Sequence, residues 1–154
     1  MPPFEFSGSA LIHAPPEHVY AIIADYRDGH TRIIPRPPFV SLEVEEGGTG
    51  SGTVIRVGIR VLGKVVHYRA FVSEPHPGRV LVETNDNGYE TSFTVEPRAD
   101  GQHSHVTIAT KMPWRAGIAG PLERWLMPRL LRPMFIRELE LLDQVASTHS
   151  PVAA

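Results

Sequence analysis

The sequence predicts an α+β domain in which a curved antiparallel sheet of about seven strands surrounds one long C-terminal helix. Most of the chain between residues 39 and 112 alternates apolar and polar side chains, which is typical of strands with one buried face. Turns rich in glycine and proline separate these segments, so we expect sequential strands to pair antiparallel. Residues 121–145 instead show helical spacing over a broad apolar face, and such a face needs a concave partner.

Length and composition indicate a single globular domain. The chain has 154 residues, of which 42% are hydrophobic and 21% are charged, and this composition fits one domain with a sizeable core. We expect residues 1–146 to form a single ligand-binding domain and residues 147–154 to be a frayed tail. No internal repeat and no linker to a second domain is visible.

Charge and cysteine content argue against several classes of function. The formal net charge is -2, whereas proteins that bind nucleic acid usually carry a basic field, so we expect no nucleic-acid partner. The absence of cysteine excludes disulfides and thiol catalysis. We find no apolar run of about 18 residues and no leader-like N-terminus, and therefore expect no membrane span and a cytoplasmic location.

The first 38 residues predict one strand and two short helices. The stretch from Phe4 to His13 alternates weakly and is expected to be a strand. Two prolines, followed by Glu17 in a first turn, favour a helix that extends to Asp25. A second short helix is expected from Tyr26 to Ile34, and the prolines after it end it.

Six more strands are expected before the closing helix. They cover residues 39–45, 53–62, 64–74, 79–85, 89–96 and 103–112. The clearest of them alternates Ile55 and Val57 with Arg56, as a half-buried antiparallel strand does. Asn87-Gly88 is a strong hairpin signal between two of these strands. The segments therefore predict a meander of antiparallel neighbours.

The closing helix, residues 121–145, has an unusually wide apolar face and two internal prolines. Pro128 and Pro133 each remove a backbone hydrogen bond, so we expect a kink or an irregular first half and a regular helix from about Met134 onward. Glu138 and the other charged residues are expected to form the polar remainder of this helix. A sheet curved around such a helix can leave a cavity between the two layers.

Two segments resemble motifs of the START/pollen-allergen superfamily, also called SRPBCC. Residues 12–20, IHAPPEHVY, resemble its IxAPxxxVW/Y opening, and residues 74–83, EPHPGRVLVE, resemble its P-x-R-x-L/V-x-E turn and strand. The resemblance implies the helix-grip fold over nearly the whole chain. It is strongest to the polyketide cyclase/dehydrase and lipid transport branch, whose members bind hydrophobic small molecules between the sheet and the long helix. The tryptophan usual in the family's second helix is absent, because residues 27–35, RDGHTRIIP, stand there.

Strand parity and the helix face predict which residues line such a cavity. They are Ile55, Val57, Tyr68, Ala70, Tyr89, Thr91, Phe93, Ile108, Thr110 and Met112 from strands, and Trp125, Leu130 and Met134 from the helix. Tyr68, Tyr89, Thr91 and Thr110 would be the polar points that ligand sites usually have. The alternative is that each tyrosine fills the core while its hydroxyl reaches the rim or a backbone carbonyl.

His30 and Tyr68 are the candidate catalytic residues. His30 is expected in a loop that caps the cavity mouth, where a histidine can act as general base, although a surface position or a local backbone cap is the simpler explanation. His103 and His105 share a strand face without a recognisable third ligand, so no metal site is expected. No cofactor is expected either, because residues 47–52 lack the Lys-Ser/Thr that completes a phosphate loop.

Three functions follow from these patterns. The first is binding of a small hydrophobic molecule, such as a lipid, a polyketide-like compound or an aromatic compound, by a monomer or homodimer. The alternative is a polyketide cyclase or dehydratase that uses cavity tyrosine or histidine residues for proton transfer. The third is a structural or partner-binding role for a domain whose core is filled and encloses no cavity.

Overall fold

The computed structural model describes residues 4–113, 117 and 119–148. The elements follow in the order β1 (Phe4–Ile12), α1 (Pro16–Ala24), α2 (Gly29–Ile33), β2 (Phe39–Glu46), β3 (Val54–Val61), β4 (Lys64–His76), β5 (Val80–Asn85), β6 (Glu90–Arg98), the short 3-10 helix η1 (Ala99–Gly101), β7 (His103–Met112) and α3 (Ala119–Thr148). This order confirms the predicted α+β fold. Among the described helices, none has the length and apolar character needed to cross a membrane.

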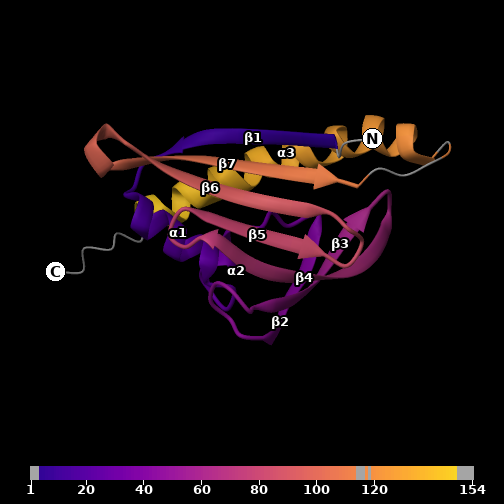
Figure 1. Cartoon of the computed structure of the whole chain (residues 1–154), viewed down its shortest axis with the longest axis horizontal. Coiled ribbons are helices and arrows are strands. Elements are labelled where there is room, and N and C mark those ends of the chain that lie inside the picture. The colour runs from indigo at the N-terminus through magenta and orange to yellow at the C-terminus, as the bar shows by residue number, and fades with distance from the viewer. Residues whose placement is uncertain (1–3, 114–116, 118, 149–154) are drawn as a thin grey trace.

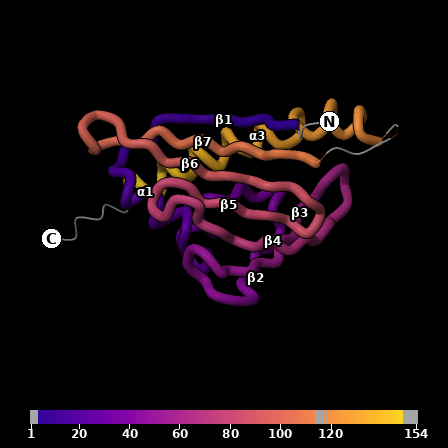
Figure 2. The backbone as a smooth tube through the Cα atoms, viewed as in Figure 1, coloured from indigo at the N-terminus to yellow at the C-terminus, as the bar shows by residue number. Residues whose placement is uncertain are grey.

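All seven strands form one antiparallel sheet in the order β1-β7-β6-β5-β4-β3-β2. Strands β2 to β7 are therefore neighbours in sequence order, as their tight turns predict. The remaining strand, β1, closes the other edge by pairing with β7, from Phe4 opposite Met112 to Ile12 opposite Ser104. Figures 1 and 2 show β1 alongside β7, and Figure 1 shows α3 running behind them along one face of the sheet. The first and last strands thus meet next to the closing helix.

Alternation along the strands separates a face toward α3 from a face toward solvent. On β3, Ile55 and Val57 are buried, whereas Arg56 and Arg60 are exposed. The neighbouring strand β4 follows the same parity and buries Ala70. The predicted inward faces of these two strands are therefore confirmed.

Helices α1 and α2 pack tightly against each other and cover one end of the inward face of the sheet. Pro16 stands in the first turn of α1, where its missing N–H needs no partner. A Cβ atom on Gly29 would lie 2.5 Å from the Ile22 carbonyl oxygen, so only glycine allows α2 to start this close to α1. The contact fixes the following residue, His30, against the backbone of α1.

The long helix α3 is continuous from Ala119 to Thr148 and contains both prolines. The expectation of an irregular first half is therefore wrong, whereas a kink at the prolines stays a prediction. Within the turn that Pro128 disturbs, the Arg129 guanidinium donates a hydrogen bond to the Trp125 carbonyl at 2.6 Å. A side-chain donor thus supports the backbone where a proline weakens the helical ladder. The helix also extends two residues into the predicted tail, and residues 149–154 of that tail lie outside the described residues.

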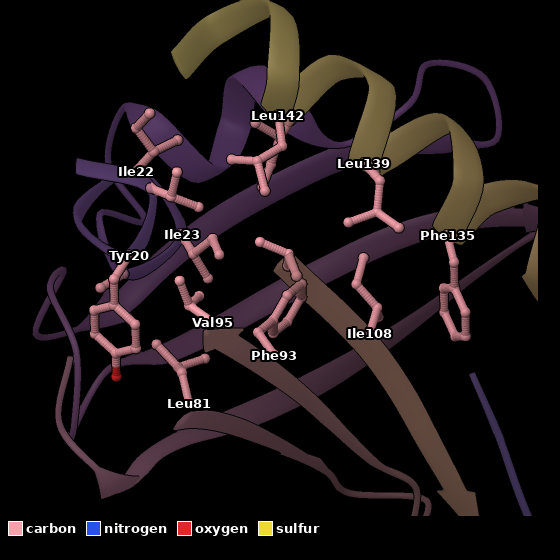
Figure 3. Packing of buried hydrophobic residues seen from close by; sticks show 14 of the residues in the cluster. Tyr20, Ile22, Ile23, Leu81, Phe93, Val95, Ile108, Phe135, Leu139 and Leu142 are labelled. Atoms are coloured by element: carbon pink, nitrogen blue, oxygen red, sulfur yellow. The ribbon is translucent and has the colours of Figure 1, made fainter. Parts of the chain in front are cut away.

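On α3, the buried hydrophobic core involves only the second half of the helix. The core members labelled in Figure 3 come from α1, the sheet and α3: Tyr20, Ile22, Ile23, Leu81, Phe93, Val95, Ile108, Phe135, Leu139 and Leu142. Residues 135–148 of α3 bury five side chains there, whereas residues 119–134 bury only Gly120 and Pro128. We call the part covered by α1, α2 and residues 135–148 the closed end, and the part under residues 119–134 the open end.

Candidate functional site

A cavity of about 190 Å³ lies between the sheet and α3. Its lining is mostly apolar and comprises His30, Ile34, Phe39, Leu42, Ile55, Val57, Ile59, Val61, Val66, Tyr68, Glu83, Asn85, Asn87, Tyr89, Thr91, Phe93, Thr110, Met127, Leu131, Met134, Phe135 and Glu138. A second hollow of about 140 Å³ adjoins it between the β3–β4 turn and α3, and the two share Met127, Leu131 and Met134. A domain with a completely filled core is therefore excluded.

Eight of the thirteen residues predicted to line a cavity do so. They are Ile55, Val57, Tyr68, Tyr89, Thr91, Phe93, Thr110 and Met134. The seven on the sheet follow from period-two alternation, because one parity of each strand faces α3. Sequence patterning thus identified about half of the sheet side of the cavity, because the predicted set omits Phe39, Leu42, Ile59, Val61, Val66, Glu83 and Asn85.

The other five predicted residues lie outside the cavity lining. Ala70, Ile108 and Met112 are buried on the expected face but contribute to the packed core. Leu130 lines the adjoining hollow. Trp125 is 56% exposed, and the Arg129 guanidinium lies over its indole ring, with Cζ 4.4 Å from the ring centre.

The placement of Trp125 corrects the expectation that it lines the cavity or fills the core. The residues of α3 that face the cavity, Met127 and Leu131, lie two and six positions later, which turns Trp125 toward the opposite side of the helix. Trp114, the other tryptophan of the sequence, lies outside the described residues.

His30 is a buried residue of α2, only 3% exposed, and does not lie in a loop over the cavity mouth as expected. Its Nδ1 is 2.7 Å from the Ile23 carbonyl oxygen. Because a carbonyl can only accept, Nδ1 carries the hydrogen, and Nε2 is the nitrogen left for the cavity. The ring stacks on Tyr26 with centres 4.3 Å apart and meets the edge of Phe93 at 5.5 Å. Helix packing and two aromatic rings therefore fix its orientation.

Glu83 of β5 lies beside His30 on the cavity wall. The Tyr26 hydroxyl donates to Glu83 Oε2 at 2.5 Å, and His30 Nε2 is 3.5 Å from the same oxygen. The backbone N–H of Tyr26 donates to the Gly48 carbonyl at 2.8 Å, which holds the ring in place from the other side. Burial, together with the Glu83 carboxylate, raises the pKa of Tyr26 well above its usual range. Tyr26 therefore remains a hydrogen-bond donor to Glu83.

Glu138 of α3 is the second carboxyl group in the cavity wall. It is 6% exposed, and its Oε1 lies 3.8 Å from His30 Nε2. Burial, with a smaller contribution from Glu83, raises the pKa of Glu138 well above its usual range. We call His30, Glu83 and Glu138 the polar end of the cavity.

Sequence reasoning missed both carboxyl groups of the polar end. Glu138 was assigned to the solvent side of the helix, and that assignment is wrong because the helical stripe Leu131, Phe135, Leu142 passes through position 138. Glu83 is on the same side of β5 as the fully buried Leu81, so strand parity points it inward. Periodicity could have found both residues, although a charged residue on a buried stripe is usually read as exposed.

The remaining polar lining groups differ in how they are satisfied. The Tyr89 hydroxyl donates to Glu123 at 2.5 Å, and the Thr91 and Thr110 hydroxyls are 2.9 Å apart. No hydrogen bond reaches the Tyr68 hydroxyl within the described part of the chain. Burial, with Glu83 and Glu138 nearby, raises the pKa of Tyr68 above its ordinary value. Tyr68 is therefore a neutral donor whose hydroxyl is available to a bound molecule.

The described residues contain no group of three or more His, Cys, Asp or Glu side chains placed to hold a metal ion. The side chains that line the cavity can supply hydrogen bonds, proton transfer and apolar contact. The polar end supplies an imidazole nitrogen and two carboxyl groups, and the rest of the wall supplies apolar surface.

Comparison with known proteins identifies a family and a fold. A family model described as polyketide cyclase / dehydrase and lipid transport matches residues 3–147. A search of curated proteins finds no match.

Several solved structures share the architecture over nearly the full length. The solution structure of KanY protein (ms6282) has a TM-score of 0.79 and 27% identity, covering 94% of this chain and 97% of that one. The Zhui aromatase/cyclase from Streptomyces sp. R1128 has a TM-score of 0.74 and 17% identity, with 94% of each chain covered. A START superfamily protein from Mycobacterium smegmatis has a TM-score of 0.70 and 14% identity, covering 95% and 99%. These likenesses confirm the helix-grip fold.

Proposed function

The chain belongs to the polyketide cyclase/dehydrase and lipid transport family, and from this premise we propose that it binds one small, mainly apolar molecule in the cavity between the sheet and α3. The observation that carries the proposal is the unfilled, mostly apolar space of about 190 Å³ with polar groups gathered at one side. An engineered cavity of about 150 Å³ in another protein holds benzene, so an aromatic ring or a short acyl chain fits the space.

The cost of keeping such a space open supports the same proposal. An apolar void deprives its lining of the dispersion contacts that a packed core would supply. Met127, Leu131 and Met134 of the open end all border the cavity and leave it unfilled. A ligand that occupies the space restores these contacts, which is a physical reason for the fold to retain it.

Filling the cavity from α3 tests the proposal. Leu131→Trp places a larger ring in the cavity wall, and Leu122→Trp makes the same change at a position that is 58% exposed. We expect the neutral fluorescent probe prodan to bind the wild type and Leu122→Trp alike, and to bind Leu131→Trp at least about tenfold more weakly. The measurement is a fluorescence titration on purified, delipidated protein, with circular dichroism to confirm that both variants are folded.

Two results would contradict ligand binding in this cavity. One is the absence of saturable probe binding to the wild type. The other is equal binding to the two tryptophan variants, because the probe would then occupy a different surface.

A second candidate function is proton transfer to a bound molecule, as in a polyketide cyclase or dehydratase. The separation of 3.8 Å between His30 Nε2 and Glu138 Oε1 favours it, because a base and an acid then face the same bound ligand. If the wild type turns over a β-hydroxy ketone of suitable size, His30→Ala and Tyr68→Phe should each lower kcat by about a hundredfold. Steady-state kinetics on folded variants measures this. Unchanged kcat in both variants would exclude those roles.

A further inference from the structure

The Glu138 carboxyl is a polar group that the fold itself does not use. It is 6% exposed, it lines an apolar cavity, and no hydrogen bond reaches it from the residues that the structure describes. His30 Nε2 is 3.8 Å from Glu138 Oε1, which is beyond hydrogen-bonding distance. A buried carboxyl group without a partner costs folding free energy. The Glu138 carboxyl in this position indicates that the bound ligand supplies its hydrogen-bonding partner.

The groups around Glu138 determine the charge that this partner carries. The ionisable groups that interact with it are His30 on α2, Tyr68 on β4 and Glu83 on β5, and Tyr26 in turn donates to Glu83. Among the described residues that line the cavity, there is no lysine or arginine. The imidazole is the only basic group, and carboxyl oxygens lie 3.5 and 3.8 Å from its Nε2. An ionised carboxyl there would repel an anionic ligand group and attract a cationic one.

We propose that the ligand of this cavity is an apolar amine, and that its ammonium group docks on the carboxyl of Glu138 while its apolar body fills the space under α3. The assignment rests on the proposed function, because it requires the cavity to be the binding site. It selects an aryl or alkyl amine and disfavours fatty acids and other carboxylates, although all of these have apolar bodies that the cavity would accept. Charge-assisted hydrogen bonds of this kind are stronger than neutral ones.

Binding of an amine should also move a proton. In the empty cavity, burial and Glu83 raise the pKa of Glu138 and so favour its protonated form. An ammonium group beside the carboxyl stabilises the carboxylate, so the proton leaves Glu138 as the ion pair forms. Neutral ligands do not stabilise the carboxylate in this way, and their binding is expected to release no proton.

Three compounds with one apolar body test the assignment: phenethylamine, phenethyl alcohol and 3-phenylpropanoate. Each competes with prodan for wild-type protein at pH 7, and the expected order of affinity is amine, then alcohol, then carboxylate. We expect the amine to bind at least about tenfold more tightly than the alcohol. Calorimetry in two buffers of different ionisation enthalpy should show proton release for the amine and none for the alcohol.

Variants of α3 assign the effect to Glu138. In Glu138→Gln, the advantage of the amine over the alcohol should disappear, while the alcohol binds within about threefold of its wild-type affinity. Glu140→Gln is the matched control, because that side chain is 58% exposed on the same helix. If Glu138→Gln does not fold, the wild-type order of affinities still decides the question.

The outcomes separate this assignment from the proposed function. Failure of the amine to displace the probe, equal displacement by all three compounds, or preference for the carboxylate overturns the amine while leaving the cavity as a binding site. An amine advantage that survives in Glu138→Gln also overturns it, because another group would then hold the ammonium. Loss of probe binding itself, tested with the Leu131→Trp and Leu122→Trp pair, would instead contradict the proposed function.

Discussion

Glu138 is a residue whose placement works against the stability of the folded chain. Most acidic side chains are exposed or paired, because burying a charge without a partner is costly. Here the carboxyl faces an apolar cavity and has Glu83 as a like-charged neighbour, and both factors raise its pKa. Such a group is retained against its own cost where a ligand uses it, as at many functional sites.

The pH dependence of stability should reveal this cost. In the unfolded chain Glu138 ionises near its ordinary pKa of about 4.3, whereas in the folded chain its pKa is raised. As the pH rises above about 4.3, the unfolded state loses the proton first. Glu138 therefore lowers the free energy of unfolding by up to about 1.4 kcal/mol per pH unit, until the folded carboxyl also ionises.

The variant Glu138→Gln removes this titration and keeps the shape of the side chain. We expect it to match the wild type near pH 4.5 and to be more stable by at least about 1 kcal/mol at pH 8, as measured by urea unfolding at both pH values. The free energy of unfolding of the control, Glu140→Gln, should stay within about 0.5 kcal/mol of the wild-type value at both pH values. A Glu138→Gln variant that is less stable than wild type at pH 8 would mean that the carboxylate has a partner in the folded chain.

At the residue scale, pattern reasoning identified one member of the polar end and missed the others. His30 could be proposed because histidine titrates near neutral pH, but its burial depends on the contact between Gly29 and the Ile22 carbonyl, which is tertiary. Glu138 lies on the apolar face that was predicted for the closing helix, whereas no buried face was predicted for the strand that carries Glu83. Their charge made exposure the natural expectation, and only the packed structure shows that both face a cavity.

At the element scale, α3 shows what an apolar pattern leaves undecided. The helix and its wide apolar face could be predicted, but the sheet covers only part of that face. Leu122, Trp125 and Ile136 remain 58, 56 and 57% exposed. Width alone does not tell which side of the stripe meets the sheet, and Trp125 was therefore assigned to the wrong side. The disruption of the helix by the two prolines was also overestimated, because the helix continues through both and the Arg129 side chain supports the turn around Pro128.

The strands were easier to predict than the helix. Period-two alternation leaves only two faces to choose from, so Ile55, Val57 and Tyr68 were assigned to the correct one. The hairpins also followed from local turn signals such as Gly63 and Asn87-Gly88, each with a glycine at positive φ. The pairing of β1 with β7 had no comparable local signal, because it joins segments about a hundred residues apart.

At the scale of the whole molecule, the cavity lies between the closed end, which contributes His30 and Glu138 to its wall, and the open end. At the closed end, α1, the sheet and residues 135–148 of α3 interdigitate in one core (Figure 3). At the open end, residues 119–134 of α3 border the cavity and the adjoining hollow by the β3–β4 turn. One helix thus belongs to both parts, and its second half anchors the first.

This division predicts unequal stability along α3, because local opening is easiest where few apolar side chains are buried. Amides of residues 122–132 should exchange with solvent deuterium at least about tenfold faster than those of residues 136–146, as measured by hydrogen-exchange mass spectrometry on the ligand-free protein. A bound ligand fills the space beneath the first half, so it should slow exchange there and leave the second half nearly unchanged. Leu131→Trp should protect the same residues without ligand, since its ring takes the ligand's place. Uniform exchange along α3 would show that the helix opens as one unit, and the open end could then not admit a ligand while the closed end stays packed.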